Sequence, residues 1–157
     1  MNMHLQKTTV DDLETLFIFQ TDETSNYVAA FNTPDPADKQ AYMEKWRKIV
    51  ANSTINMKTI FVDDVPVGSV AHFEIEDETN VSYWIDRQHW GKGIATKALQ
   101  QLLATTDKKI LYARIAYDNT GSQKVLERNG FVRIGTDKGF ANGRGKEIEE
   151  FVYRLEL

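Results

Sequence analysis

The chain has 157 residues, of which 41% are hydrophobic and 27% are charged. This length and balance favour one globular domain spanning residues 1–157 and exclude a disordered or collagen-like chain. A net charge of −4 without a basic block disfavours a nucleic-acid partner, and the absence of cysteine excludes disulfides, thiolate metal sites and a cysteine nucleophile.

The predicted elements of the first half are a strand at 3–7, a helix from Thr8 or Thr9 to about residue 20, a helix beginning at Asp35–Pro36, and strands at 59–62 and 67–75. Asp35 is expected to cap the second helix because proline is favoured at the first helical position. The pair Asp63–Asp64 predicts a hairpin turn.

The second half predicts strands and helices in alternation. They are a strand at 80–86, a helix after Gly91–Lys92–Gly93, a strand at 110–116, a helix at 120–128 stopped by Gly130, and strands at 131–135 and 151–157. The order β-α-α-β-β-β-α-β-α-β-β indicates an α+β fold with a mixed central sheet and flanking helices.

No signal for secretion or membrane insertion is found. Residues 1–7 lack the apolar run of a signal peptide, and no stretch approaches the ~20 apolar residues of a membrane span. We therefore expect a cytoplasmic protein with no membrane partner. Monomer and homodimer are both compatible with the sequence.

The turn from strand to helix at Gly91 and Gly93 is the most informative local feature. A helix begins with unpaired backbone N–H groups and a positive dipole end, and glycines let a phosphate approach them closely. A plain tight connection is the alternative. A P-loop is excluded because Lys92 lies between the glycines, and a dinucleotide fingerprint needs a third glycine where Thr96 stands.

Two motifs connect this turn to a known family. The segment Gln88-His89-Trp90-Gly91-Lys92-Gly93 matches the pattern Gln/Arg-x-x-Gly-x-Gly/Ala, and residues 119–131 match Asn-x-x-Ser-x-x-x-Leu-Glu-x-x-Gly-Phe. In these motifs the sequence resembles the GNAT (N-acetyltransferase) superfamily, in the branch of the ribosomal-protein N-terminal acetyltransferases. The resemblance extends from about Val67 to the C-terminus.

The resemblance implies an N-acetyltransferase that moves an acetyl group from acetyl-CoA to a primary amine, either a protein N-terminus or a small-molecule amine. It also implies a splayed parallel strand pair, direct attack in a ternary complex, and no metal. The implied coenzyme A contacts are Trp84, Ile85, Asp86, Gln88, Gly91, Lys92, Gly93, Ile94, Ala95, Thr96, Asn119 and Ser122. Backbone N–H groups near Trp84 and Ile85 would bind the oxyanion.

Two residues of the second motif are catalytic candidates. The resemblance places Asn119 against coenzyme A and Ser122 over its sulfur, as proton donor to the departing thiolate. Asn119 is equally expected as a helix N-cap, and Ser122 as an ordinary helix serine. Other branches of the superfamily have a tyrosine where this chain has Leu126, so the more familiar acid is missing.

The acceptor side has weaker signals. Period-two alternation groups His72, Glu74 and Glu76 as candidates for a proton relay, with a solvated strand face as the alternative. Tyr27 and Phe31 lie where this family builds its acceptor pocket. Two other functions are considered, a non-catalytic acyl-CoA sensor or scaffold of the same fold, and a dinucleotide oxidoreductase that uses the glycine turn.

Overall fold

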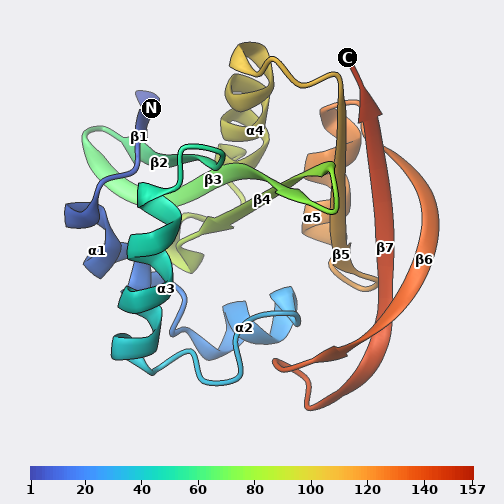
Figure 1. Ribbon diagram of the computed structural model, residues 1–157, viewed down its shortest axis with the longest axis horizontal. Helices are drawn as coiled ribbons and strands as arrows, with labels where there is room; N and C mark the ends of the chain where they lie inside the picture. Colours follow the sequence, from blue (N-terminus) through green and yellow to red (C-terminus); the bar gives the residue numbers. More distant parts are fainter.

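The computed structural model describes residues 1–157 and contains one seven-stranded sheet in the order β1-β2-β3-β4-β5-β7-β6 (Figure 1). The strands are β1 Met3–Lys7, β2 Asn56–Val62, β3 Val65–Ile75, β4 Glu78–Ile85, β5 Ile110–Ala116, β6 Val132–Ala141 and β7 Lys146–Glu156. The helices are α1 Leu13–Phe19, α2 Glu23–Ala29, α3 Lys39–Ala51, α4 Ile94–Thr105 and α5 Thr120–Arg128, with 3-10 helices at Val10–Asp12 and Arg87–His89.

Helices cover both faces of this sheet. Val70 and Ala71 are successive residues of β3 and therefore point to opposite faces. Val70 belongs to a buried core that includes Leu99 of α4, whereas Ala71 packs with Leu16 of α1 and Tyr42 of α3 in a second core. The sheet is thus the middle layer, which confirms the predicted fold class.

The parallel strands β4 and β5 separate soon after they meet. They pair only at Thr79 with Leu111 and at Asn80 with Tyr112, although both strands continue beyond these pairs. Every other neighbouring pair in the sheet is antiparallel and is paired over most of its length. The separation opens the sheet in its middle and exposes the facing edge of β4.

The predicted start of the second helix is wrong by several residues. Asp38, not Asp35, caps α3, because its Oδ1 accepts a hydrogen bond from the Ala41 N–H at 3.0 Å. Asp35 Oδ1 accepts from Ala37 N–H in a turn, and the Pro36 carbonyl accepts from Gln20 Nε2 at 2.6 Å. The Asp35–Pro36 pair therefore belongs to the loop before α3, and the hydrogen bond from Gln20 ties this loop to the end of α1.

Helix α2 was not predicted. Asp22 begins it by accepting a hydrogen bond from Ser25 N–H at 2.9 Å, and the Ser25 hydroxyl donates to the same carboxylate. The helix has only 7 residues and no apolar stripe, so periodicity gave no sign of it. The capping pair Asp22 and Ser25 was the available signal.

The last two strands are longer than predicted. Strand β6 runs on to Ala141 and β7 begins at Lys146, so residues predicted as a loop form a long hairpin. Most of the added residues are polar or glycine, and β6 is an exposed edge strand. Apolar alternation cannot reveal such a strand because its side chains are not buried. No helix of the protein is both long and apolar enough to cross a membrane.

Candidate active site

Two cavities meet where β4 and β5 separate. The larger cavity, of about 740 Å³, lies between the sheet and helices α1 to α3, and the smaller cavity, of about 650 Å³, lies beside the first turns of α4 and α5. Ala29, Tyr83, Trp84, Asn119 and Ser122 line both. A molecule bound in one cavity can therefore reach a molecule bound in the other.

The start of α4 forms one wall of the smaller cavity. Gly91 and Gly93 have φ angles of 76° and 75°, in the left-handed region that favours glycine. No side chain caps this helix, and none of the hydrogen bonds of the protein uses the backbone N–H groups of residues 91–96. These donors and the helix dipole together make a binding site for an anion such as a diphosphate.

Basic side chains from α5 add positive charge to the smaller cavity. Lys124 and Arg128 line it, one helical turn apart, and His89 approaches from the 3-10 helix before α4. No role was predicted for any of the three. The spacing of Lys124 and Arg128 on the predicted helix 120–128 was the signal that could have found them.

Most of the predicted coenzyme A contacts lie together in the smaller cavity. They are Trp84, Ile85, Gly91, Gly93, Ile94, Ala95, Thr96, Asn119 and Ser122. Asp86, Gln88 and Lys92 do not line it. The Asp86 N–H donates to the Val67 carbonyl and closes the β3–β4 pairing, while Gln88 and Lys92 are exposed.

The pairing of β3 with β4 determines which backbone groups face the opening. Since Asp86 N–H bonds to β3, strand alternation directs the polar groups of Trp84 to β3 and those of Tyr83 and Ile85 to the opening. The Ile85 carbonyl accepts a hydrogen bond from Trp90 Nε1 at 2.9 Å. By this alternation the N–H groups of Tyr83 and Ile85 face the opening, and that of Trp84 faces β3.

Asn119 and Ser122 lie at the junction of the two cavities. Asn119 caps α5, because its Oδ1 accepts a hydrogen bond from the Ser122 N–H at 3.1 Å. No hydrogen bond of the protein uses Asn119 Nδ2 or the Ser122 hydroxyl. Asn119 is therefore a helix cap that keeps a free donor, and Ser122 presents a free hydroxyl.

The family follows from the sequence as a whole. The model of the acetyltransferase (GNAT) domain matches residues 2–132. The chain belongs to the GNAT acetyltransferase family. The resemblance drawn from the two motifs is confirmed, and the protein is an acyltransferase enzyme.

Relatives of this GNAT enzyme include proteins named for acetylation. A Bacillus licheniformis protein named as an uncharacterized N-acetyltransferase is 23% identical over 96% of this chain and 90% of its own length. The ribosomal-protein-serine acetyltransferase of Escherichia coli is 31% identical over 50% of this chain and 48% of that protein. The solved structure of RimL, a ribosomal-protein alpha-N-acetyltransferase, in complex with coenzyme A has a TM-score of 0.82 at 18% identity, covering 99% of this chain and 94% of that one.

Tyr83 is a further polar group at the junction of the two cavities, and no role was predicted for it. Its hydroxyl donates to the Ser122 carbonyl at 3.5 Å, so it links β4 to α5 across the junction. Burial raises the pKa of the Tyr83 phenol to about 12. The phenol therefore stays protonated and neutral at physiological pH.

The three residues proposed for a proton relay do not lie together in the GNAT site. His72 lines neither cavity, and its Nε2 lies 3.1 Å from Asn56 Nδ2 and 3.3 Å from Thr106 Oγ1. Glu76 is exposed in the turn after β3. Alternation showed which side chains share a strand face but not which face borders the cavity.

Glu74 is the one member of that group that borders the larger cavity. Its carboxylate accepts a hydrogen bond from Thr79 Oγ1 at 2.7 Å and pairs with Lys108 Nζ at 3.3 Å. The hydrogen bond from Thr79 is the main reason that the pKa of Glu74 is lowered. Glu74 is therefore a negative charge already engaged by two partners.

Several aromatic side chains line the larger cavity of the GNAT enzyme. Those that line it are Phe19, Phe31, Tyr42, Phe73, Tyr83, Trp46 and Trp84. Trp84 is held there by a hydrogen bond from its Nε1 to the Phe19 carbonyl at 3.3 Å. Of the two residues predicted to wall the acceptor pocket, Phe31 lines the larger cavity, whereas Tyr27 is 58% exposed and lines neither cavity.

Proposed function

We propose that the protein transfers the acetyl group of acetyl-CoA to a primary amine, by direct attack of the amine while both substrates are bound. The observation that carries this proposal is the row of unpartnered amides at residues 91–96, beside a cavity that joins a second one at Ser122. The coenzyme A complex of the related RimL structure supports the choice of carrier.

In this proposal the smaller cavity holds the carrier. The amides of residues 91–96 bind the diphosphate, and Lys124 and Arg128 supply further positive charge for phosphate groups. Asn119 Nδ2 is free to donate to the pantetheine arm. The exposed edge of β4 then provides the backbone groups that neighbouring strands would otherwise pair.

The larger cavity brings the amine to the thioester. The neutral amine attacks the carbonyl carbon, a C–N bond forms, and the N–H groups of Tyr83 and Ile85 stabilise the negative oxygen. The C–S bond breaks, and the sulfur leaves with the electron pair. The Ser122 hydroxyl gives a proton to the sulfur and recovers one released by the amine, directly or through water.

Ser122→Ala is expected to lower kcat by no more than about 10²-fold, the low end for general acid catalysis. The effect is modest because a thiol has a pKa of about 8.5, so its thiolate leaves with little assistance. Steady-state rates of coenzyme A release give the comparison. Ser53→Ala, at an exposed serine that lines neither cavity, is the control. A loss of kcat as large as that caused by removing the whole site would show that Ser122 does more than donate a proton.

The function itself is tested by measuring coenzyme A release from acetyl-CoA with a panel of amines. The panel contains peptides with free N-termini and small-molecule amines, so it also assigns the acceptor class. An acyl-CoA sensor would bind acetyl-CoA and release nothing with any amine. A thermal shift with NAD but not with acetyl-CoA would instead favour the oxidoreductase, because a bound ligand raises the melting temperature.

A further inference from the structure

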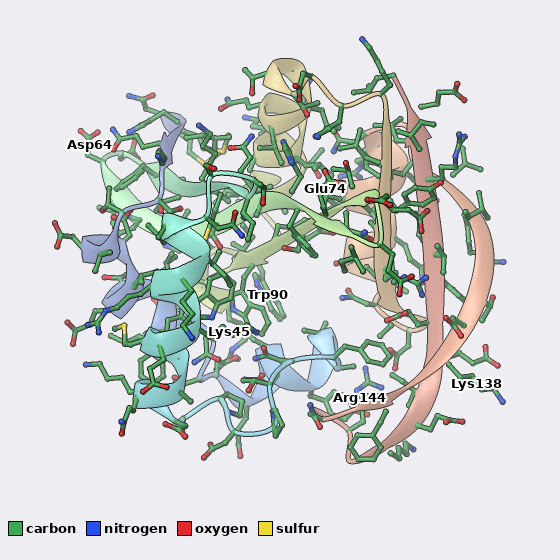
Figure 2. All side chains as sticks on the ribbon, viewed as in Figure 1. Lys45, Asp64, Glu74, Trp90, Lys138 and Arg144 are labelled. Carbon is green, nitrogen blue, oxygen red and sulfur yellow. The ribbon has the colours of Figure 1, made fainter.

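Arg144 lies at the tip of the β6–β7 hairpin, beside α2 (Figure 2). Its side chain is only 4% exposed. Nη1 and Nη2 donate to the two carboxylate oxygens of Asp118 at 3.0 and 2.9 Å, and Nε donates to the Tyr27 carbonyl at 2.6 Å. The guanidinium also lies 4.1 Å from the centre of the Tyr27 ring. Arg144 thus joins the β6–β7 hairpin to α2 and to the turn that precedes α5.

The rest of the hairpin tip is fitted to the segment that follows α2. Asn142 Nδ2 donates to the Asn32 carbonyl at 2.7 Å, and Gly143 N–H donates to the Ala30 carbonyl at 2.8 Å. A Cβ atom at Gly143 would lie 2.2 Å from the Asn26 carbonyl oxygen, so only glycine permits this approach. The hairpin tip therefore packs directly against α2 and the segment that follows it.

The segments joined by Arg144 belong to different cavities. Phe31 to Thr33 follow α2 and line the larger cavity, where the proposed function places the amine. Asp118 lines the smaller cavity and immediately precedes Asn119. In the proposed function the position of the amine relative to the thioester thus depends on these two segments. Arg144 connects the second of them, through Asp118, to α2, which leads directly into the first.

We propose that Arg144 is a positioning residue that aligns the acceptor wall at residues 31–33 with the turn at residues 118–119. The inference rests on the proposed function for the identity of the two ligands. Arg144 touches neither cavity by itself, so it acts through Asp118 and through the backbone of α2. A bidentate fork fixes direction as well as distance, which a lysine cannot reproduce.

Arg144→Ala is expected to lower kcat/KM for the best amine of the panel by about 10- to 100-fold, because small misplacements of reacting groups have effects of this size. The dissociation constant for acetyl-CoA should rise by less than about tenfold, because only the turn at residues 118–119 loosens and the amides of residues 91–96 lie on another element. Arg144→Lys should recover part of the loss. Arg154→Ala removes an arginine from the same hairpin whose partner is Glu156 at 3.3 Å, and it should leave kcat/KM unchanged.

Unchanged kcat/KM in Arg144→Ala, or equal losses in kcat/KM and in acetyl-CoA affinity, would overturn the inference. Hydrogen exchange provides a measurement that does not need turnover. Amides of residues 26–33 and 117–122 should exchange at least about tenfold faster in Arg144→Ala than in Arg154→Ala. Equal exchange would refute the positioning role. A wild-type protein that releases no coenzyme A would instead remove the proposed function, and the exchange comparison would still decide on Arg144.

Discussion

Replacing Gly93 with valine is expected to weaken acetyl-CoA binding by about 10²-fold, or about 2.7 kcal/mol. Gly93 has a φ of 75°, and no atom lies within 4 Å of the position of an added Cβ. The new side chain therefore occupies open space at the lining of the smaller cavity and holds a diphosphate away from the amides of residues 91–96. Isothermal titration calorimetry measures the dissociation constant.

Gly145→Val is the matched control for this substitution. Gly145 also has a positive φ, of 67°, and open space at its Cβ position, but it lines neither cavity. Both variants introduce backbone strain of about 1–2 kcal/mol, which thermal melts report without ligand. Similar acetyl-CoA affinities in the two variants would mean that the carrier does not bind at the start of α4.

Gly68→Ala is expected to destabilise the protein by about 3 kcal/mol, at the upper end for an overpacked core. A Cβ atom at Gly68 would lie 2.2 Å from the Trp84 carbonyl oxygen and 3.1 Å from Ile85 Cα. Since both contacts are with backbone, β3 and β4 must move apart. The same movement displaces the edge of β4 to which the proposed function assigns the thioester, so turnover should fall by about 10²-fold.

Gly135→Ala separates the clash from the general effect of a glycine replacement in a strand. Gly135 is in β6, and a Cβ there meets nothing within 4 Å. Urea unfolding and coenzyme A release are measured for both variants. If Gly68→Ala is as stable and as active as Gly135→Ala, the close approach of β3 to β4 has no role in the site.

Elements with a strong local signal at both ends were predicted with their correct bounds. Helix α5 is 120–128 in both the prediction and the structure, because Asn119 caps it and Gly130, with a φ of 88°, ends it. The α3 start was missed because Asp35 and Asp38 are both good caps, and only the contact of Pro36 with the distant Gln20 decides between them. The local sequence thus narrows the start of α3 to two possible capping residues, and tertiary contacts determine which one is used.

The site was predictable to the extent that it depends on backbone near a motif. The free amides after Gly91 follow from a glycine turn at the start of a helix, and the structure contains them. Whether the N–H of Tyr83 or that of Trp84 faces the opening depends on the pairing of β3 with β4, which the sequence of one strand does not reveal. Distant partners likewise place His72, which contacts Thr106 after α4, and Arg144, whose partner Asp118 is 26 residues away.

Only two residue pairs join β4 to β5, at one end of these strands, so the sheet consists of two parts, β1–β4 and β5–β7. Within each part the strands are hydrogen-bonded over most of their length, whereas the boundary between the parts relies on side-chain packing and on any molecule bound there. A carrier arm that bonds along the edge of β4 would take the place of the missing ladder. We therefore expect bound acetyl-CoA to link the two parts of the sheet. The melting temperature should rise with acetyl-CoA concentration, and amide hydrogen exchange should slow in both β4 and β5.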